Sequence, residues 1–447
     1  MSGLRSEAGA RGGPPLALVN ARVIDPASGF DQTGGIVVAD GVIADIGPHL
    51  ARSGAVAASG AHGIEAFDCR GLCLAPGLVD MRVQLREPGE EHKETMATAS
   101  AAAAAGGVTT MVGLPNTKPV IDDAALVESI ARRARETSRV RIYTYGALTR
   151  GLAGKELTEI GLLAAAGAVG FTDGTQAVAD AQVMRRALLY ARIFEKPIIQ
   201  HPEEPALARN GAMNDGEIAM RLGIPGIPAV AETMMVERDL RLVQLTQGRL
   251  HIAHVSTRSA VNAIRRAKAR GLNVTCDTAP PYFSLNETAV GDYRTFAKLS
   301  PPLRTEADRR AVIDGLKDGT IDAIASDHAP HDTDAKRLPF AQAAFGMIGL
   351  ETLLCITLEL VHNRYLALPA ALAKMTHAPA GLLGLNAGRL SKGAAADLFL
   401  FDPERPWKIA EKDFHSKSKN SPFDGRPVQG RVLRTWVGGR TVFHLAD

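Results

Sequence analysis

Polar and apolar side chains alternate along a short stretch near residue 80. Four apolar residues interleave there with four polar ones: Val79, Met81, Val83 and Leu85 with Asp80, Arg82, Gln84 and Arg86. A period of two residues predicts a β-strand whose two faces meet different surroundings. Pro88 and Gly89 then end the strand. A polar row in a strand that apolar residues flank costs free energy unless it faces a site, so we expect a site on that face.

Eight short apolar runs in the middle of the chain are typical of strands. Ala-rich or amphipathic runs separate them, such as those at 94–105 and 179–194, and these are long enough to be crossover helices. The charged run at 90–94 is expected to form a solvated helix start. Eight strand–helix units predict a (β/α)8 TIM barrel, an α/β fold with its chemistry at the carboxyl ends of the strands. The expected strands are 78–85, 107–114, 140–148, 168–172, 196–200, 249–255, 273–277 and 321–325.

Both ends of the chain have the pattern of short antiparallel strands. From Leu16 to Phe67, and again from Ala395 to Phe443, apolar runs are broken by Asn, Asp, Gly and Pro. We expect the two ends to pair into one small β-sandwich beside the barrel. The expected boundaries are a disordered tail at 1–15, the sandwich at 16–70 and 386–447, and the barrel at 71–385.

The composition limits the partners and the compartment. The 447 residues are 46% hydrophobic and 22% charged, an ordinary balance that supplies a large core. A net charge of +3 gives no argument for a nucleic-acid or membrane partner. Four scattered cysteines do not make a disulfide scaffold, and the sequence shows neither an apolar run of membrane-spanning length nor an apolar signal core. We therefore expect a cytoplasmic protein without nucleic-acid or membrane partners.

Polar residues cluster where the expected barrel strands end. A single buried histidine is usually a core residue with one hydrogen bond, but here four strand ends deliver two aspartates and two histidines. Asp and His are ligands of first-row divalent metals, above all zinc, and a catalytic site leaves one position open for water. The spacing therefore predicts a hydrolytic metal site, at least in the ancestry of the chain. The residues are Asp173, His201, His254 and Asp327, with Arg86, Asn116, His328 and His331 at or near the strand ends as well.

Ten sequence runs together resemble one enzyme family. They are PGLVDM at 76–81, LREPG at 85–89, GGVTT at 106–110, PNT at 115–117, ALTRGL at 147–152, GIPGIP at 223–228, HIAHVST at 251–257, PPLR at 301–304, ASDHAPH at 325–331 and GMIGLE at 346–351. From about Leu16 to Phe443 the chain resembles a type I dihydroorotase of the amidohydrolase superfamily. The resemblance implies a role in de novo pyrimidine biosynthesis. Members of that family close carbamoyl aspartate to dihydroorotate, reversibly, and use one or two zinc ions.

The chain departs from the family at the metal ligands. The family's first strand reads His-x-His-x-Arg and holds the first metal, whereas this chain has Arg82 and Gln84 in those places. One aspartate of the fourth-strand motif is missing, so the place of the metal-bridging aspartate falls on Gly174, and Asp173 would have to shift to serve. Arg82 has no acceptor atom and stays protonated. We expect it to form an ion pair with Asp327 in the place of the first metal.

The remaining matches imply a partial site. Zinc lowers the pKa of bound water from about 15.7 to about 7, which corresponds to roughly 12 kcal/mol of help in making hydroxide, and no remaining side chain replaces that. We expect at most one zinc ion per chain, on His201, His254, Asp173 and Asp327, or none. By resemblance, Asp327 is also the catalytic base. The implied substrate contacts are Arg86, Asn116, His331, the backbone near Phe345 and Gly346, and Ser300 in place of an asparagine.

Three functions stay open, and with them whether the chain is an enzyme. The first, which we expect, is a dihydroorotase-like chain with impaired or lost catalysis that is a structural or regulatory partner of aspartate transcarbamoylase. The second is an active single-zinc dihydroorotase or related cyclic amidohydrolase, in which Asp327 moves the proton. The third is a non-catalytic binder of a small acidic, dihydroorotate-like ligand, since Arg86 and Asn116 can grip a carboxylate. We also expect a homo-oligomer.

Overall fold

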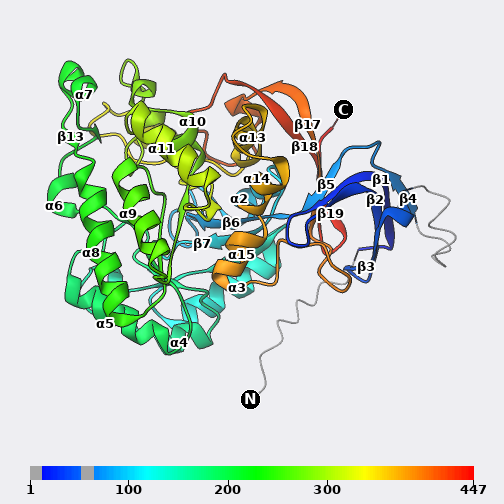
Figure 1. The fold of residues 1–447 in the computed structure, drawn as a ribbon, viewed down its shortest axis with the longest axis horizontal. Coiled ribbons are helices and arrows are strands. Elements are labelled where there is room, and N and C mark those ends of the chain that lie inside the picture. Colours follow the sequence, from blue (N-terminus) through cyan, green and yellow to red (C-terminus); the bar gives the residue numbers. More distant parts are fainter. Residues whose placement is uncertain (1–12, 52–64, 447) are drawn as a thin grey trace.

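The structure is a computed structural model that describes residues 13–51 and 65–446, so most of the expected tail lies outside the described residues. A barrel of short strands wrapped by helices fills one side of the molecule, and a body made mostly of strands lies at the other (Figure 1). The chain ends contribute to the second body, as their strand-like pattern predicts.

The expected (β/α)8 barrel is confirmed. Its strands pair in parallel, and the short strands β8 and β9 together occupy the third position. A parallel bridge between Val83 and His328 joins the first strand to the end of the eighth and closes the ring. The strands are β6 (Leu78–Val83), β7 (Val108–Gly113), β8 (Arg141–Thr144), β9 (Gly146–Ala147), β10 (Phe171–Thr172), β11 (Ile198–Gln200), β14 (Leu250–Ile252), β15 (Val274–Thr278) and β16 (Ala323–Ile324).

Helices cover the outside of the barrel (Figure 1). Several begin at a side chain that accepts a hydrogen bond from the first turn, as Asp123, Asp180 and Thr257 do, which satisfies amide groups that have no partner inside the helix. The longer helices are α2 (Met96–Ala105), α3 (Ala124–Thr137), α5 (Ala181–Arg192), α8 (Val230–Thr246), α9 (Arg258–Ala269), α11 (Glu306–Lys317) and α13 (Leu353–His362). The shorter elements are α4 (Ile160–Ala165), α6 (Pro205–Ala208), α7 (Glu217–Leu222), α10 (Pro280–Ser284), α12 (Thr333–Arg337), α14 (Leu368–Ala373), α15 (His377–Leu383), β12 (Met213–Asn214) and β13 (Gly226–Ile227).

The two chain ends share one hydrogen-bonded sheet. The strands that the structure describes run in the order β19-β18-β17-β5-β1-β2-β3, with β4 paired to β1. Strand β5 falls inside the range expected for the barrel, yet it pairs with β1 and β17, so the sheet extends to Pro76. The strands are β1 (Leu16–Asp25), β2 (Phe30–Ala39), β3 (Val42–Gly47), β4 (Glu65–Asp68), β5 (Cys73–Pro76), β17 (Leu398–Lys408), β18 (Pro427–Val437) and β19 (Arg440–His444).

Polar contacts fix this sheet to the barrel wall. Arg141 in β8 forms an ion pair with Asp397, in which Nε lies 2.6 Å from Oδ2. The Thr435 hydroxyl in β18 donates to the carbonyl oxygen of Ala104 at the end of α2, at 2.7 Å. The sheet is therefore tied to the third strand of the barrel and to the helix that follows its first strand.

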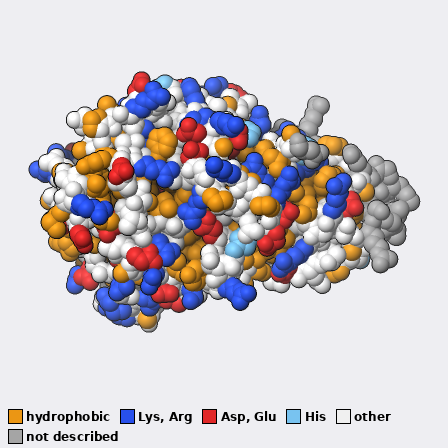
Figure 2. All heavy atoms as spheres, turned by 90° about the horizontal axis from the view of Figure 1, so that it is seen from above, with side chains coloured by type: hydrophobic (Ala, Val, Ile, Leu, Met, Phe, Trp, Pro, Cys, Tyr) orange, Lys and Arg blue, Asp and Glu red, His pale blue; other side chains and the backbone are white. Residues whose placement is uncertain are grey.

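The surface agrees with the small net charge. Basic and acidic side chains are interspersed on the face that Figure 2 shows. None of the helices in residues 13–51 and 65–446 is long and apolar enough to cross a membrane.

Candidate active site

A cavity of about 410 Å³ lies at the carboxyl ends of the barrel strands. It brings together most of the residues that the sequence singled out, although they come from distant parts of the chain. Asp173, Gly174 and His254 are not part of its wall. The expected residues that line it are Arg82, Gln84, Arg86, Asn116, His201, Ser300, Asp327, His331, Phe345 and Gly346.

Arg82 joins three strand ends at the bottom of the site. Its Nε donates to Asp327 Oδ1 at 2.8 Å, and its Nη2 donates to the carbonyl oxygen of Gly174 at 3.2 Å. The Arg82 side chain is 3% exposed, and its Nη1 has no hydrogen-bond partner among the described residues. Burial raises the pKa of Asp327, and the guanidinium opposes that rise. The structure therefore has the ion pair that the sequence predicts.

His201 and His254 lie side by side next to this pair. His201 Nδ1 is 3.0 Å from His254 Nε2, so one nitrogen donates a hydrogen bond to the other. Burial, with help from the Arg82 and His201 charges, holds the pKa of His254 far below its usual value. His254 is therefore neutral, and its Nδ1 has no partner among the described residues.

Asp173 is held by Thr149. Both of its carboxylate oxygens accept hydrogen bonds from Thr149, one from the backbone amide at 2.8 Å and one from the hydroxyl. These contacts do not support the expectation that Asp173 completes a metal site with His201 and His254, which stays a prediction. Thr149, at the end of the neighbouring strand, already donates a hydrogen bond to each oxygen of the Asp173 carboxylate.

The side chains of the site do not fit a zinc ion. Zinc needs three or four ligands from Cys, His, Asp or Glu. Among the residues that the structure describes, no group of three such side chains could hold a metal ion. His201 and His254 supply two nitrogens, but the cation of Arg82 lies beside them and already holds Asp327.

Arg86 is held by the protein itself. Its Nε donates to the carbonyl oxygen of Pro330 at 3.0 Å, its Nη1 donates to Glu90 Oε2 at 3.0 Å, and its Nη2 lies 3.1 Å from His331 Nε2. Burial, Arg86 and nearby lysines lower the pKa of His331 to about 3, so this imidazole is neutral. Arg86 therefore presents positive charge at the cavity wall while its nitrogens contact protein groups.

The charged run at 90–94 is only partly solvated: Glu91 and His92 are exposed, whereas Glu90 and Glu94 are buried. Glu90 is 7% exposed and pairs with Arg86, Lys93 and Lys118. Although burial opposes it, these cations lower the pKa of Glu90 to about 2. Glu94 is fully buried and accepts hydrogen bonds from Ser416 and Lys417. The expected solvated helix start is thus wrong for Glu90 and Glu94, and the helix itself begins only at Met96. Glu90 instead anchors Arg86.

Glu203 is a site residue that the sequence reasoning missed. It lines the cavity, and its Oε1 lies 3.7 Å from His201 Nε2 and 3.5 Å from the Ser300 hydroxyl. Burial works against ionisation, but His201 and Arg304 leave the pKa of Glu203 below its usual value. Its place two residues after His201, just beyond a strand end, was the available signal.

Two of the expected residues also contact each other: Asn116 Nδ2 donates to Gln84 Oε1 at 3.2 Å.

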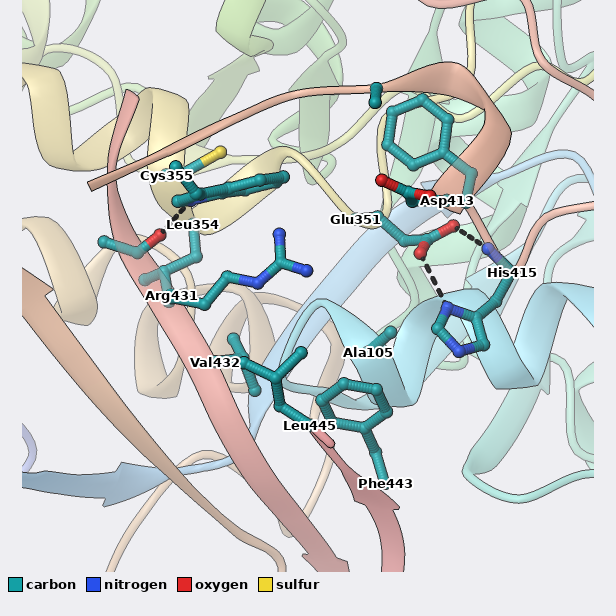
Figure 3. A pocket seen from close by; sticks show the side chains of 14 residues that line it. Ala105, Glu351, Leu354, Cys355, Asp413, His415, Arg431, Val432, Phe443 and Leu445 are labelled. Atoms are coloured by element: carbon teal, nitrogen blue, oxygen red, sulfur yellow. Dashed lines mark hydrogen bonds and ion pairs between the residues drawn. The ribbon is translucent and has the colours of Figure 1, made fainter. Parts of the chain in front are cut away.

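A second, smaller cavity of about 50 Å³ lies between α13 and the terminal sheet (Figure 3). One of its two carboxylates, Glu351, accepts hydrogen bonds from the backbone amides of His415 and Ser416 and from the His415 ring. The guanidinium carbon Cζ of Arg431 lies 3.8 Å from the centre of the Trp407 ring. Because this cavity lies away from the strand ends and is far smaller, the chemistry belongs to the barrel cavity.

Comparisons with known proteins identify the family. A family model described as dihydro-orotase-like matches residues 71–260. A dihydroorotase from Wolbachia sp. subsp. Drosophila simulans is 46% identical over 438 residues, which cover 98% of this chain and 97% of the relative. The chain belongs to the dihydroorotase family. A second dihydroorotase, from Desulforapulum autotrophicum, is 48% identical over 423 residues, which cover 95% and 97% of the two chains.

Solved structures show the same architecture as this dihydroorotase family member. The L-hydantoinase (dihydropyrimidinase) from Arthrobacter aurescens matches with a TM-score of 0.85 and 26% identity over 97% of both chains. The dihydropyrimidinase from Brevibacillus agri, at 22% identity and a TM-score of 0.82, shares the fold over 96% of this chain and 95% of its own. The resemblance indicated by the ten sequence runs is thereby confirmed, together with the fold.

Proposed function

We propose that the barrel cavity binds carbamoyl aspartate and dihydroorotate, and that the chain interconverts them slowly, without zinc, in pyrimidine biosynthesis. Relatives named dihydroorotase match nearly the whole chain, and these names favour turnover over the loss of catalysis that the sequence suggested. The observation that carries the proposal is the position of Arg82, a buried cation that lines the cavity and holds Asp327 by an ion pair.

In the proposed reaction Asp327 transfers the proton and Arg82 stabilises the developing negative charge. In the ring-opening direction, water attacks the ring amide carbon and Asp327 takes the proton that water loses. Arg82 stabilises the negative charge that develops on the amide oxygen. The carbon–nitrogen bond then breaks, and Asp327 gives the proton to the leaving nitrogen. Ring closure follows the same steps in reverse.

The size of these effects predicts slow turnover. One hydrogen-bond donor to a developing oxyanion contributes about 3–4 kcal/mol. Zinc offers roughly 12 kcal/mol towards making hydroxide at neutral pH. The guanidinium therefore replaces only part of what a metal supplies, and the rate falls by orders of magnitude relative to a two-zinc enzyme.

The wall of the cavity suits a ligand with carboxylates. Arg82 and Arg86 bring two positive charges to it, and Asn116 and Ser300 add neutral hydrogen-bonding groups. The backbone at Phe345 and Gly346 completes the wall. A cavity of about 410 Å³ is large enough for a ligand of this size.

A second candidate function is a ligand-binding subunit without turnover. Two contacts favour it: Arg82 occupies one oxygen of Asp327, and Thr149 occupies both oxygens of Asp173. In this form the chain would bind the same acidic ligand and act as a partner of aspartate transcarbamoylase. That partnership, like the expected homo-oligomer, stays a prediction.

One experiment separates these functions. The purified full-length chain is treated with a chelator, its zinc content is measured, and it is tested for dihydroorotate hydrolysis and, by calorimetry, for binding of carbamoyl aspartate. We expect slow hydrolysis that survives chelation and is lost in Asp327→Asn. Binding without hydrolysis would favour the second candidate. One zinc ion per chain with hydrolysis that chelation abolishes would show a single-metal enzyme, and absence of binding would contradict both proposals.

A further inference from the structure

Two buried lysines lie behind the wall of the cavity. Lys298, two residues before Ser300, and Lys336, in α12, are each 2% exposed. Neither forms an ion pair with a carboxylate among the residues that the structure describes; both amines donate to backbone carbonyls instead. Burying an ammonium group without a counterion is expensive, whereas a methionine of similar length would bury without that cost. These two positions therefore need a reason beyond packing.

Both amines hold the same backbone segment, residues 341–346. Lys298 Nζ donates to the carbonyl oxygen of Ala341 at 3.0 Å and lies 4.3 Å from the centre of the Phe345 ring. Lys336 Nζ donates to the carbonyl oxygens of Ala344 at 2.7 Å and Gly346 at 3.0 Å. Three carbonyls of one short segment are thus fixed by two cations.

The end of that segment forms part of the cavity wall, through Phe345 and Gly346. The Gly346 amide donates to the carbonyl oxygen of Lys298 at 2.9 Å, and Asn420 Nδ2 donates to the Gly346 carbonyl oxygen at 3.1 Å. Gly346 has a φ of 121°, and a Cβ there would lie 2.7 Å from Ala329 Cβ. The wall approaches the end of the eighth strand so closely that a small displacement of the segment changes the cavity.

We propose that Lys298 and Lys336 are positioning residues, which hold the backbone of Phe345 and Gly346 where a carboxylated ligand of the cavity meets it. The identity of that ligand rests on the proposed function, but the holding of the segment does not. The two ammonium groups also place positive charge behind the wall, which favours an anion in the cavity.

The charge of the two lysines gives the proposal a pH signature. Burial lowers the pKa of Lys298 to about 8, and burial together with Lys298 lowers the pKa of Lys336 to about 7. Anion binding should therefore weaken as the pH rises through this range, by at most about tenfold per pH unit for each proton lost. The neighbouring imidazole of His331 stays neutral, because its pKa is about 3. The other charged groups near His331 are Arg86, Lys93 and Asp332.

The first test is amide hydrogen exchange in residues 338–347 of the ligand-free, full-length chain. We expect Lys336→Met and Lys298→Met each to speed exchange there by about tenfold or more, because the carbonyls lose their donor. The matched control is Lys374→Met, since Lys374 is partly buried and donates to the carbonyl oxygen of Ile321, before β16 begins. Wild-type exchange in a folded Lys336→Met or Lys298→Met protein would overturn the proposal.

The second test is calorimetric binding of carbamoyl aspartate at several pH values. We expect Lys336→Met to bind about tenfold more weakly and to lose much of the pH dependence between about pH 6 and about pH 9. Unchanged affinity and pH dependence in both lysine variants would contradict a positioning role. If the wild type bound neither carbamoyl aspartate nor dihydroorotate, the proposed function would fail, while the exchange result would still decide whether the lysines hold the segment.

Discussion

Arg82 Nε lies 2.8 Å from Asp327 Oδ1, which joins the first strand of the barrel to the end of the eighth across 245 residues of sequence. The same guanidinium contacts the carbonyl oxygen of Gly174 after the fourth strand. One cation thus links three places where the family keeps metal ligands. The pair gives the partly buried Asp327 a counterion from the protein itself, and it makes position 82 the most informative one to change.

Replacing Arg82 by methionine should destabilise the protein and weaken ligand binding. The change keeps most of the apolar stem but removes the guanidinium, which leaves Asp327 without its partner. Removing one member of a buried pair costs about 2 kcal/mol or more. Asp327 remains partly exposed at the cavity, so water moderates the loss. Urea unfolding measures the first effect and calorimetry with carbamoyl aspartate the second. The control is Arg209→Met, since Arg209 also lines the cavity but is exposed; equal effects of both changes would contradict a special role for the pair.

Restoring two histidines should restore metal binding. The double variant Arg82→His/Gln84→His removes the competing cation and adds two nitrogen ligands next to Asp327, which completes a set of three. We expect at least one zinc ion per chain by elemental analysis and faster dihydroorotate hydrolysis that a chelator abolishes. Zinc without turnover would implicate Gly174 and Ser300 as further losses. A double variant without zinc would show that the ligands do not converge as we infer.

The barrel could be predicted because each of its strands is marked by the residues next to it in the sequence. Glycine, proline and the two-residue period mark strands within a few residues, and β6 was expected at 78–85 and found at Leu78–Val83. The strand ends earlier because Gln84 and Arg86 turn towards the cavity, and Arg86 has a positive φ of 60°. The pairing of Arg82 with Asp327 could also be predicted, since both stand at strand ends of one barrel.

Long-range partners could not be predicted in the same way. Asp173 turns to Thr149 because the end of the neighbouring strand offers two donors, and nothing near residue 173 in the sequence shows this. Glu94 is buried because Ser416 and Lys417, more than 320 residues away, donate to it. Charged side chains are usually solvated, and only the fold reveals the donors that bury Glu94.

Replacing Glu90 by glutamine should remove the part of the free energy of unfolding that depends on the ionised Glu90 carboxylate. Glu90 has a folded-state pKa of about 2, below its usual value, because Lys93, Lys118 and Arg86 outweigh the effect of burial. A lowered pKa means that the stabilisation is fully present above the unfolded-state pKa of about 4.3 and is lost as the pH falls towards about 2. We expect Glu90→Gln to lose roughly 2 kcal/mol near neutral pH and to converge with the wild type in acid. Urea unfolding at several pH values measures this, and a constant difference across the range would contradict it.

Alanine at position 346 should damage the cavity wall more than alanine at another glycine with positive φ. At Gly346 a Cβ would lie 2.7 Å from Ala329 Cβ, so the segment from Phe345 onward must move, at a cost of about 1–3 kcal/mol. At Gly223, with a φ of 66°, no atom lies within 4 Å of the added Cβ, so Gly223→Ala adds only backbone strain. We expect Gly346→Ala to weaken binding of carbamoyl aspartate by about tenfold, whereas Gly223→Ala leaves it near the wild-type value. Calorimetry on both variants, with urea unfolding as a check on folding, measures the difference. Equal losses of affinity would mean that strain alone, and not the close approach of the wall to Ala329, is responsible.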